Sequence, residues 1–418
     1  MLLATLKHTQ SALLSLFILT LGLGLLMTLL PLRLHHAHVS VLLIGLITTA
    51  YYAGLILGSF RIEPFIQRVG HIRAFSAFAS AFGVVCLLQG LWPNPWIWVF
   101  LRFISGICTA VLFIVIESWL LSKSTLQTRG QILALYMIAL YAAQAAGQFF
   151  LSIGTLTFIP FAIVSMLASL SVIPLAVTKA PSPTYQDPSP VRLKTLYTVS
   201  PSGFLGSFIS GLGLSAIYGL MPLFFAQLKL STHTIATLTA IIIFGGMCFQ
   251  YPIGRLSDKT DRRLVLLAMS IATVMSAISI MVFAEQGEHT LLYIASFLLG
   301  GFIFTLYPLS ISQLCDQLKA DDIVAGTQGL LLIYSVGATI GPLVATVFMH
   351  AIFFPYGLLL YFCVLGLALT GFLLWRKSAN PVLPDENAQA FVNLPQTTPI
   401  AAELDPRSDE DTKLNPSD

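Results

Sequence analysis

Two ionisable residues lie within one long apolar stretch, which runs from Trp98 to Trp119. Arg102 is near the start of this stretch and Glu117 is near its end. A helix rises about 1.5 Å per residue, which would place the two side chains about 22 Å apart, too far for an ion pair. A charge inside a membrane costs about 2.5–3.5 kcal/mol on insertion scales, so it usually faces a cavity or a partner. Each residue therefore needs its own role.

Each of these two residues has two candidate roles. Arg102 can be a cavity cation that binds an anionic group of a solute or influences a nearby proton site. It can instead be structural, bonded to helix carbonyls or extended towards the membrane surface. Glu117 can carry a coupling proton, or it can pair at the membrane surface with Lys123 or Arg129. The sequence leaves both questions open.

The composition of the whole chain is that of a membrane protein. Of 418 residues, 56% are hydrophobic and only 9% are charged, whereas a soluble domain has about 25% charged residues. A membrane span needs about 20 apolar residues. We therefore predict an all-α membrane protein with twelve transmembrane helices, at residues 11–31, 41–60, 74–92, 96–119, 131–152, 157–177, 201–226, 235–253, 264–284, 290–314, 323–350 and 357–375.

An internal repeat divides these spans into two groups of six. A shift of 191 residues aligns Gly54 with Gly245, and a shift of 194 aligns Gly106 with Gly300. We predict a six-helix bundle over 1–177, a Pro- and Ser-rich linker over 178–200, a second bundle over 201–376 and a disordered acidic tail over 377–418. Two pseudo-symmetric bundles imply a cavity between them and alternating access. The repeat partners of Arg102 and Glu117 are Ser296 and Ile311, so the fold itself does not require either charge.

The distribution of basic residues predicts the orientation. If the N-terminus is cytoplasmic, the 21 Lys and Arg residues lie on the cytoplasmic side except for Arg33, Lys229 and the intramembrane Arg102. Loops rich in Lys and Arg stay in the cytoplasm. We therefore expect both termini of this multi-pass protein to be cytoplasmic, and we expect it to lie in a bacterial cytoplasmic (inner) membrane.

Two loops related by the repeat resemble the loop signature of the major facilitator superfamily, a glycine followed by an aspartate and basic residues. The resemblance implies a latch on the cytoplasmic side, because a carboxylate there can pair with basic side chains and cap a helix. The alternative is that the basic residues only set the orientation. The second-half loop has Asp261 where the signature has glycine, and the first-half loop has Gln67 where it has aspartate. The latch candidates are Arg68, Gly70, Arg73, Gly254, Asp258, Lys259, Arg262 and Arg263.

The stretch with Arg102 and Gly106 also resembles the fourth helix of proton-coupled members of this superfamily. The glycine and Gly-Pro signature of its antiporters is missing from the fifth span and occurs instead at Gly341-Pro342, which weakens a drug/proton antiporter reading. The resemblance implies that certain spans line a substrate cavity, although any of their polar residues can equally be a packing residue. The cavity candidates are Tyr51, Tyr141, Gln144, Gln148, Tyr218, Gln250, Tyr307, Gln313, Gln328 and Tyr334.

The expected function is therefore secondary active transport of a small solute, coupled to protons or another ion and acting by symport or antiport. An efflux antiporter for drugs or metabolites is the alternative within transport, and a non-transporting sensor or assembly protein is the alternative outside it. We expect no enzyme activity, because no nucleotide-binding or hydrolase motif occurs. We also expect no cofactor, no metal and no nucleic-acid partner. The expected protein is a monomer in the lipid bilayer.

Overall fold

The computed structural model describes residues 2–125, 127–178, 193–351, 353–379 and 389–408. It confirms the predicted fold class, with twelve helices long and apolar enough to cross a membrane. The first six spans are formed by α1 (Leu2–His36), α2 (Val41–Arg61), α4 (His71–Leu91), α5 (Pro95–Ser122), α6 (Arg129–Gly147) with the 3-10 helix η1 (Gln148–Ile153), and α7 (Ile159–Leu170) with α8 (Val172–Ala176). The other six are α10 (Pro201–Gln227), α11 (Thr232–Ser257), α12 (Arg262–Gln286), α13 (His289–Cys315), α14 (Ala320–Ala351) and α15 (Gly357–Ala379).

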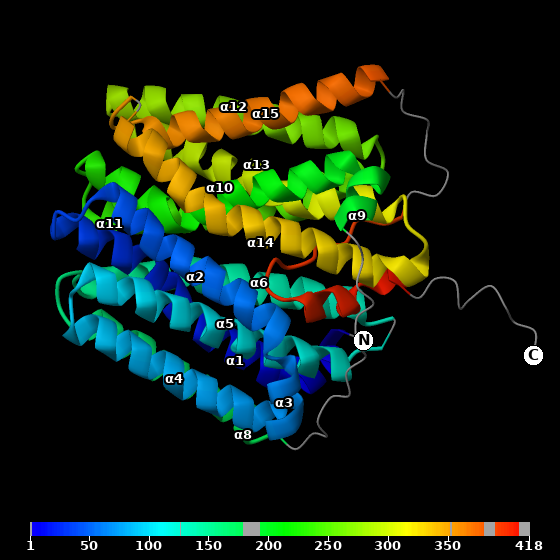
Figure 1. Cartoon of the computed structure of the whole chain (residues 1–418), viewed down its shortest axis with the longest axis horizontal. Coiled ribbons are helices and arrows are strands. Elements are labelled where there is room, and N and C mark those ends of the chain that lie inside the picture. The colour runs from blue at the N-terminus through cyan, green and yellow to red at the C-terminus, as the bar shows by residue number, and fades with distance from the viewer. Residues whose placement is uncertain (1, 126, 179–192, 352, 380–388, 409–418) are drawn as a thin grey trace, which may run out of the picture.

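Within the described residues, three short helices lie outside the spans. They are α3 (Glu63–Val69), α9 (Leu193–Val199) and the 3-10 helix η2 (Pro399–Leu404). Within the predicted linker, residues 193–199 therefore form a helix, while residues 179–192 lie outside the described part. Figure 1 shows the first six spans as one layer, the last six as a second layer, and η2 in red between the two.

The glycines of the internal repeat are close-contact points between helices. A methyl group on Gly54 of α2 would clash with the carbonyl oxygen of Phe103 in α5. The equivalent Gly245 of α11 meets the carbonyl oxygen of Phe297 in α13 in the same way. Only a glycine lets two helix backbones approach so closely. The repeat seen in the sequence therefore corresponds to the same helix packing in both halves.

The two halves touch each other directly at one end of the molecule. There α2 packs on α14, and the Thr49 hydroxyl donates to the carbonyl oxygen of Thr339 at 2.8 Å. Gly45 of α2 fits against the side chain of Thr346, and Gly219 of α10 fits against that of Thr48. This end is therefore closed by helix-to-helix contact.

The opposite end is filled by a C-terminal segment, Gln389–Ser408, which we call the tail segment; we call this end of the molecule the tail end. Here η2 packs against α5 and α6 of the first half and α14 of the second. The side chains of Leu394, Ile400 and Leu404 are buried. The sequence predicted disorder from residue 377 onward, and for the tail segment that prediction is wrong. Its apolar side chains find their partners on helices far away in the sequence, so no local pattern reveals them.

Candidate functional site

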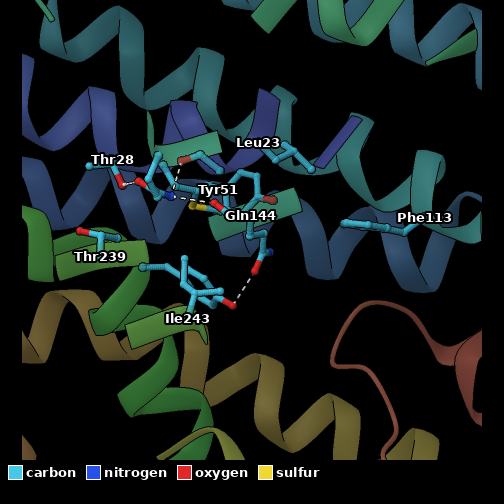
Figure 2. Close-up of a pocket in the computed structure, with 11 residues that line it drawn as sticks. Leu23, Thr28, Tyr51, Phe113, Gln144, Thr239 and Ile243 are labelled. Carbon is cyan, nitrogen blue, oxygen red and sulfur yellow. Dashed lines mark hydrogen bonds between the residues drawn. The ribbon is translucent and has the colours of Figure 1, made fainter. Parts of the chain in front are cut away.

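A cavity lies between the two halves, near the middle of the membrane-spanning helices. It consists of two adjoining spaces of about 40 and 80 Å³. Both are lined by Met27, Tyr51, Phe113 and Gln144 of the first half and by Tyr218 of the second. Figure 2 shows the smaller space, with Tyr51 and Gln144 beside it. Side chains from both halves therefore form a single site.

Hydrogen bonds fix the polar side chains of this cavity. The Tyr218 hydroxyl donates to Gln144 Oε1 at 2.9 Å and thereby joins α10 to α6 across the halves. The Thr28 hydroxyl donates to Gln148 Oε1 at 2.6 Å, and Gln148 Nε2 donates to the carbonyl oxygen of Gly24 at 3.0 Å. Because these partners are oriented in advance, the cavity presents neutral hydrogen-bonding groups at defined positions.

The structure places six of the ten predicted cavity residues on the cavity wall. They are Tyr51, Tyr141, Gln144, Gln148, Tyr218 and Tyr334. Gln250 lies one contact away, with its Nε2 3.4 Å from the Tyr141 hydroxyl.

The other three predicted cavity residues lie elsewhere. Tyr307 packs behind the wall, with its ring 4.9 Å from that of Tyr334. Gln313 is buried at the end of α13, where its backbone carbonyl accepts from Ser200. Gln328 donates to the carbonyl oxygen of Pro399 in the tail segment at 3.2 Å.

Several residues of the cavity wall were not predicted from the sequence. Most of them have a small or apolar side chain, which carries no chemical signal in a sequence of this composition; Tyr52 and Gln396 are the exceptions. The missed residues are Leu23, Gly24, Met27, Thr28, Tyr52, Leu55, Phe113, Leu140, Thr239, Ile243, Ser335, Ala338, Gln396 and Thr397. Two of them, Gln396 and Thr397, belong to the tail segment, so the tail forms one wall of the cavity.

Arg102 is buried beside this cavity, with only 3% of its surface exposed. Its guanidinium lies over the ring of Tyr51, 4.1 Å from the centroid, and its Nη2 lies 3.9 Å from the sulfur of Met27. Both contact residues also line the cavity. A cation stacked on an aromatic ring gains about 2 kcal/mol when it is desolvated. The side chain therefore does not extend to the membrane surface, and its positive charge is held next to the cavity.

Glu117 is fully buried near the tail end of α5. Its carboxylate accepts hydrogen bonds from the hydroxyls of Tyr136, at 2.7 Å, and of Thr397 and Thr398. The two threonines belong to the tail segment. The carboxylate is therefore part of the site that holds this segment, a role that the sequence did not indicate.

The loop between α11 and α12 also holds the tail segment. Arg262 bridges two carboxylates, with its Nη2 3.3 Å from Asp258 and its Nε 2.6 Å from Asp316. The same carboxylates accept from the tail backbone, Asp258 from the Phe391 amide at 2.7 Å and Asp316 from the Gln389 amide at 3.1 Å. Arg262 donates in turn to the Gln389 carbonyl. Carboxylate and guanidinium together thus clamp the start of the tail segment.

The basic latch candidates other than Arg262 do not join this cluster. Arg68, Arg73 and Lys259 are exposed at the tail end, and Arg263 is half-buried. Gly70 has a φ of 93° and links α3 to α4, a conformation that favours glycine.

Two further residues of the second loop have structural roles. Asp261, where the signature has glycine, caps α12 by accepting from the Arg263 amide at 2.9 Å. Gly254 lies against the ring of Phe391, where a methyl group would clash. Within the described residues, no group of three or more His, Cys, Asp and Glu side chains is placed to hold a metal ion.

The relatives of this chain include uncharacterised bacterial transporters. The uncharacterised MFS-type transporter YcaD of Escherichia fergusonii is 32% identical over 332 residues, which cover 78% of this chain and 85% of that protein. YcaD of Escherichia coli K12 is 31% identical over 343 residues, which cover 80% of this chain and 88% of that protein. The protein is accordingly a multi-pass inner-membrane protein.

Two solved structures share the fold at low sequence identity. The nucleoside transporter NupG superimposes with a TM-score of 0.70 at 13% identity, over 89% of this chain and 97% of that one. A bacterial homologue of the human lysosomal transporter Spinster, in an inward-facing and occupied conformation, gives a TM-score of 0.68 at 16% identity, over 89% and 96%. The sequence profile of the Major Facilitator Superfamily matches residues 12–201 and 203–407. The chain belongs to the Major Facilitator Superfamily.

Proposed function

We propose that the protein is a secondary active transporter, which carries a small solute through the central cavity by alternating access. The observation that carries this proposal is the cavity itself, which both halves line and which is closed towards one end by α2 and α14. When two bundles rock against each other around such a site, the site opens to one side at a time.

We propose that the tail end is cytoplasmic. The helix ends and short connections at this end carry Arg61, Arg68, Lys123, Arg255 and Lys259. The opposite end carries Arg33 and Lys229. An excess of Lys and Arg in short loops marks the cytoplasmic side. Both termini then lie in the cytoplasm, and the state described here is the one that would face inward.

The cavity favours a small, neutral solute that carries hydroxyl or amide groups. Its hydrogen-bonding groups include the uncharged side chains of Thr28, Gln144, Gln148 and Tyr218. Buried polar groups reject a solute that leaves them unpaired, so they select solutes that can satisfy them. A nucleoside has this chemistry, and NupG, which shares the fold, is a nucleoside transporter. Nucleosides are therefore among the first solutes to test.

We propose proton coupling through Arg102 and Glu117. Arg102 holds a fixed positive charge beside the cavity wall, over Tyr51. Glu117 is a buried group that can take up and release a proton, and it lies on the same helix, closer to the tail end. Both side chains are buried, and both belong to the span formed by α5.

Solute counterflow in proteoliposomes tests the transport proposal. Vesicles loaded with unlabelled solute should take up the labelled solute faster than protein-free vesicles, for at least one member of a panel of nucleosides and other neutral hydroxylated solutes. Tyr218→Phe should raise the half-saturating concentration, because it removes the hydrogen bond to Gln144. The change Tyr251→Phe, at an exposed position of α11, is the matched control. The transport proposal is wrong if no solute of the panel shows counterflow, either with the full chain or with a chain that lacks the tail segment.

A further inference from the structure

The tail segment, Gln389–Ser408, lies where a solute would have to pass between the two halves. Gln396 and Thr397 form the side of the cavity that faces the tail end. The remaining free spaces, about 40 and 80 Å³, are far smaller than the roughly 300–1,000 Å³ of ordinary ligand sites. With the tail segment in place, the cavity has room for only a few waters.

The tail segment is bonded to both halves at once. In the first half, Glu117 accepts from Thr397 and Thr398. In the second half, Gln328 donates to the carbonyl oxygen of Pro399 at 3.2 Å. Closing this end by rocking would bring α5 and α14 together where η2 now lies. The tail segment therefore has to leave before the halves can close.

The tail segment carries its own buried ion pair. Arg407 Nη2 lies 2.7 Å from Asp405 Oδ2, and both side chains are buried. Arg407 Nη1 also donates to the Ser312 hydroxyl of α13 at 3.3 Å. Burial lowers the pKa of Arg407, but the neighbouring Cys315 and the Asp405 carboxylate raise it above its ordinary value overall. Because Asp405 neutralises Arg407 within the segment, the segment can enter a buried site without bringing an unpaired charge.

We propose that Gln389–Ser408 is an autoinhibitory plug, which occupies the solute pathway at the tail end and holds the two halves apart until it is displaced. This inference rests on the proposed transport function for its biological meaning. The displacement itself is a property of the structure, which can be measured without any solute.

A cysteine behind the plug reports on its position. Ser335 lines the cavity beside Gln396 and Thr397, so Ser335→Cys is reached from the tail end only if the plug is out. The five native cysteines are first replaced with serine or alanine. The exposed change Lys259→Cys is the control, because it lies at the same end outside the plug.

The experiment measures the rate of labelling by a membrane-impermeant maleimide in inside-out vesicles. Deletion of residues 389–418 should raise the rate at Ser335→Cys at least tenfold and leave the rate at Lys259→Cys unchanged. A synthetic peptide of Gln389–Ser408 should restore protection when it is added at about millimolar concentration, the effective concentration of a tethered segment. Equal rates at Ser335→Cys with and without the segment would overturn the proposal.

A second variant covers the case in which the deletion prevents folding. A site for a specific protease is placed between Ala379 and Gln389, and the folded full-length protein is cleaved and washed. Exposure of Ser335→Cys after this treatment supports the plug. Continued protection would show that the segment is a permanent part of the fold, which contradicts the proposal.

Spin labels test whether the plug holds the halves apart. Arg68→Cys and Lys259→Cys place one label on each half at the tail end. The full chain should give one long distance between the two labels. Removal of the plug should add a population of molecules in which this distance is shorter. An unchanged distribution would overturn this part of the proposal. A change in labelling and distance without counterflow of any solute would instead contradict only the transport function.

Discussion

At the scale of single residues, Arg102 is a buried cation whose described contacts are an aromatic ring and a thioether sulfur. Such a charge costs free energy, so its removal should not destabilise the protein. We expect Arg102→Met to lower solute flux driven by an imposed pH gradient at least tenfold and to leave the unfolding temperature unchanged or higher. Arg102→Lys, which keeps the charge, should retain part of the flux. Unchanged flux in Arg102→Met would remove this residue from the coupling mechanism.

Thr398 gives a second prediction at this scale. Its hydroxyl donates to the Glu117 carboxylate, and a hydrogen bond to a charged group contributes about 1.5–3 kcal/mol. Thr398→Val keeps the shape but leaves the carboxylate short of a donor. Because 1.4 kcal/mol corresponds to a factor of ten, we expect labelling of Ser335→Cys to rise about tenfold or more. Thr260→Val, at an exposed threonine, is the control and should leave the labelling rate unchanged.

At the scale of helices, the repeated glycines give a matched pair of predictions. Gly54→Val and Gly245→Val should each lower the stability by at least about 1–3 kcal/mol, because overpacking forces two backbones apart. Gly371→Val, on α15, meets nothing within 4 Å and should have little effect. The thermal unfolding midpoint of the purified protein measures all three. A similar loss in all three variants would show that the effect is not specific to the helix contacts.

The helices were largely predictable from the sequence because their signals are local. Long apolar runs define the spans, and glycines at a constant offset define the packing of α2 on α5 and of α11 on α13. The tail segment was not predictable in this way. Thr398 lies 281 positions from Glu117, and Phe391 lies 133 positions from Asp258. A polar sequence that contains prolines predicts disorder, and its order becomes apparent only when the distant surface that it contacts is known.

At the scale of the whole molecule, the orientation yields a prediction. A membrane-impermeant thiol reagent should label Lys259→Cys in inside-out vesicles and Lys229→Cys in intact cells with a permeable outer membrane. These residues lie at opposite ends of α11, so they are a matched pair on one helix. The reverse pattern would place the tail end outside the cell and contradict the assignment from basic residues.

The central cavity was predictable only in part from the sequence, because helices of both halves build its wall. Tyrosine and glutamine stand out in an apolar chain, which made Tyr51, Gln144 and Tyr218 identifiable. Met27 and Phe113 line the same cavity with side chains that occur throughout the core. Which apolar residues face a cavity depends on how the two halves meet, and no single helix contains that information.

The position of the tail segment after the last span also determines when its contacts can form. Domains fold as they leave the ribosome, with the N-terminal part first. The segment Gln389–Ser408 is synthesised after α15, so all twelve spans have been made before it exists. A newly inserted molecule therefore has its spans before the tail segment is available, and the contacts of that segment with Glu117 and Gln328 form only after the spans.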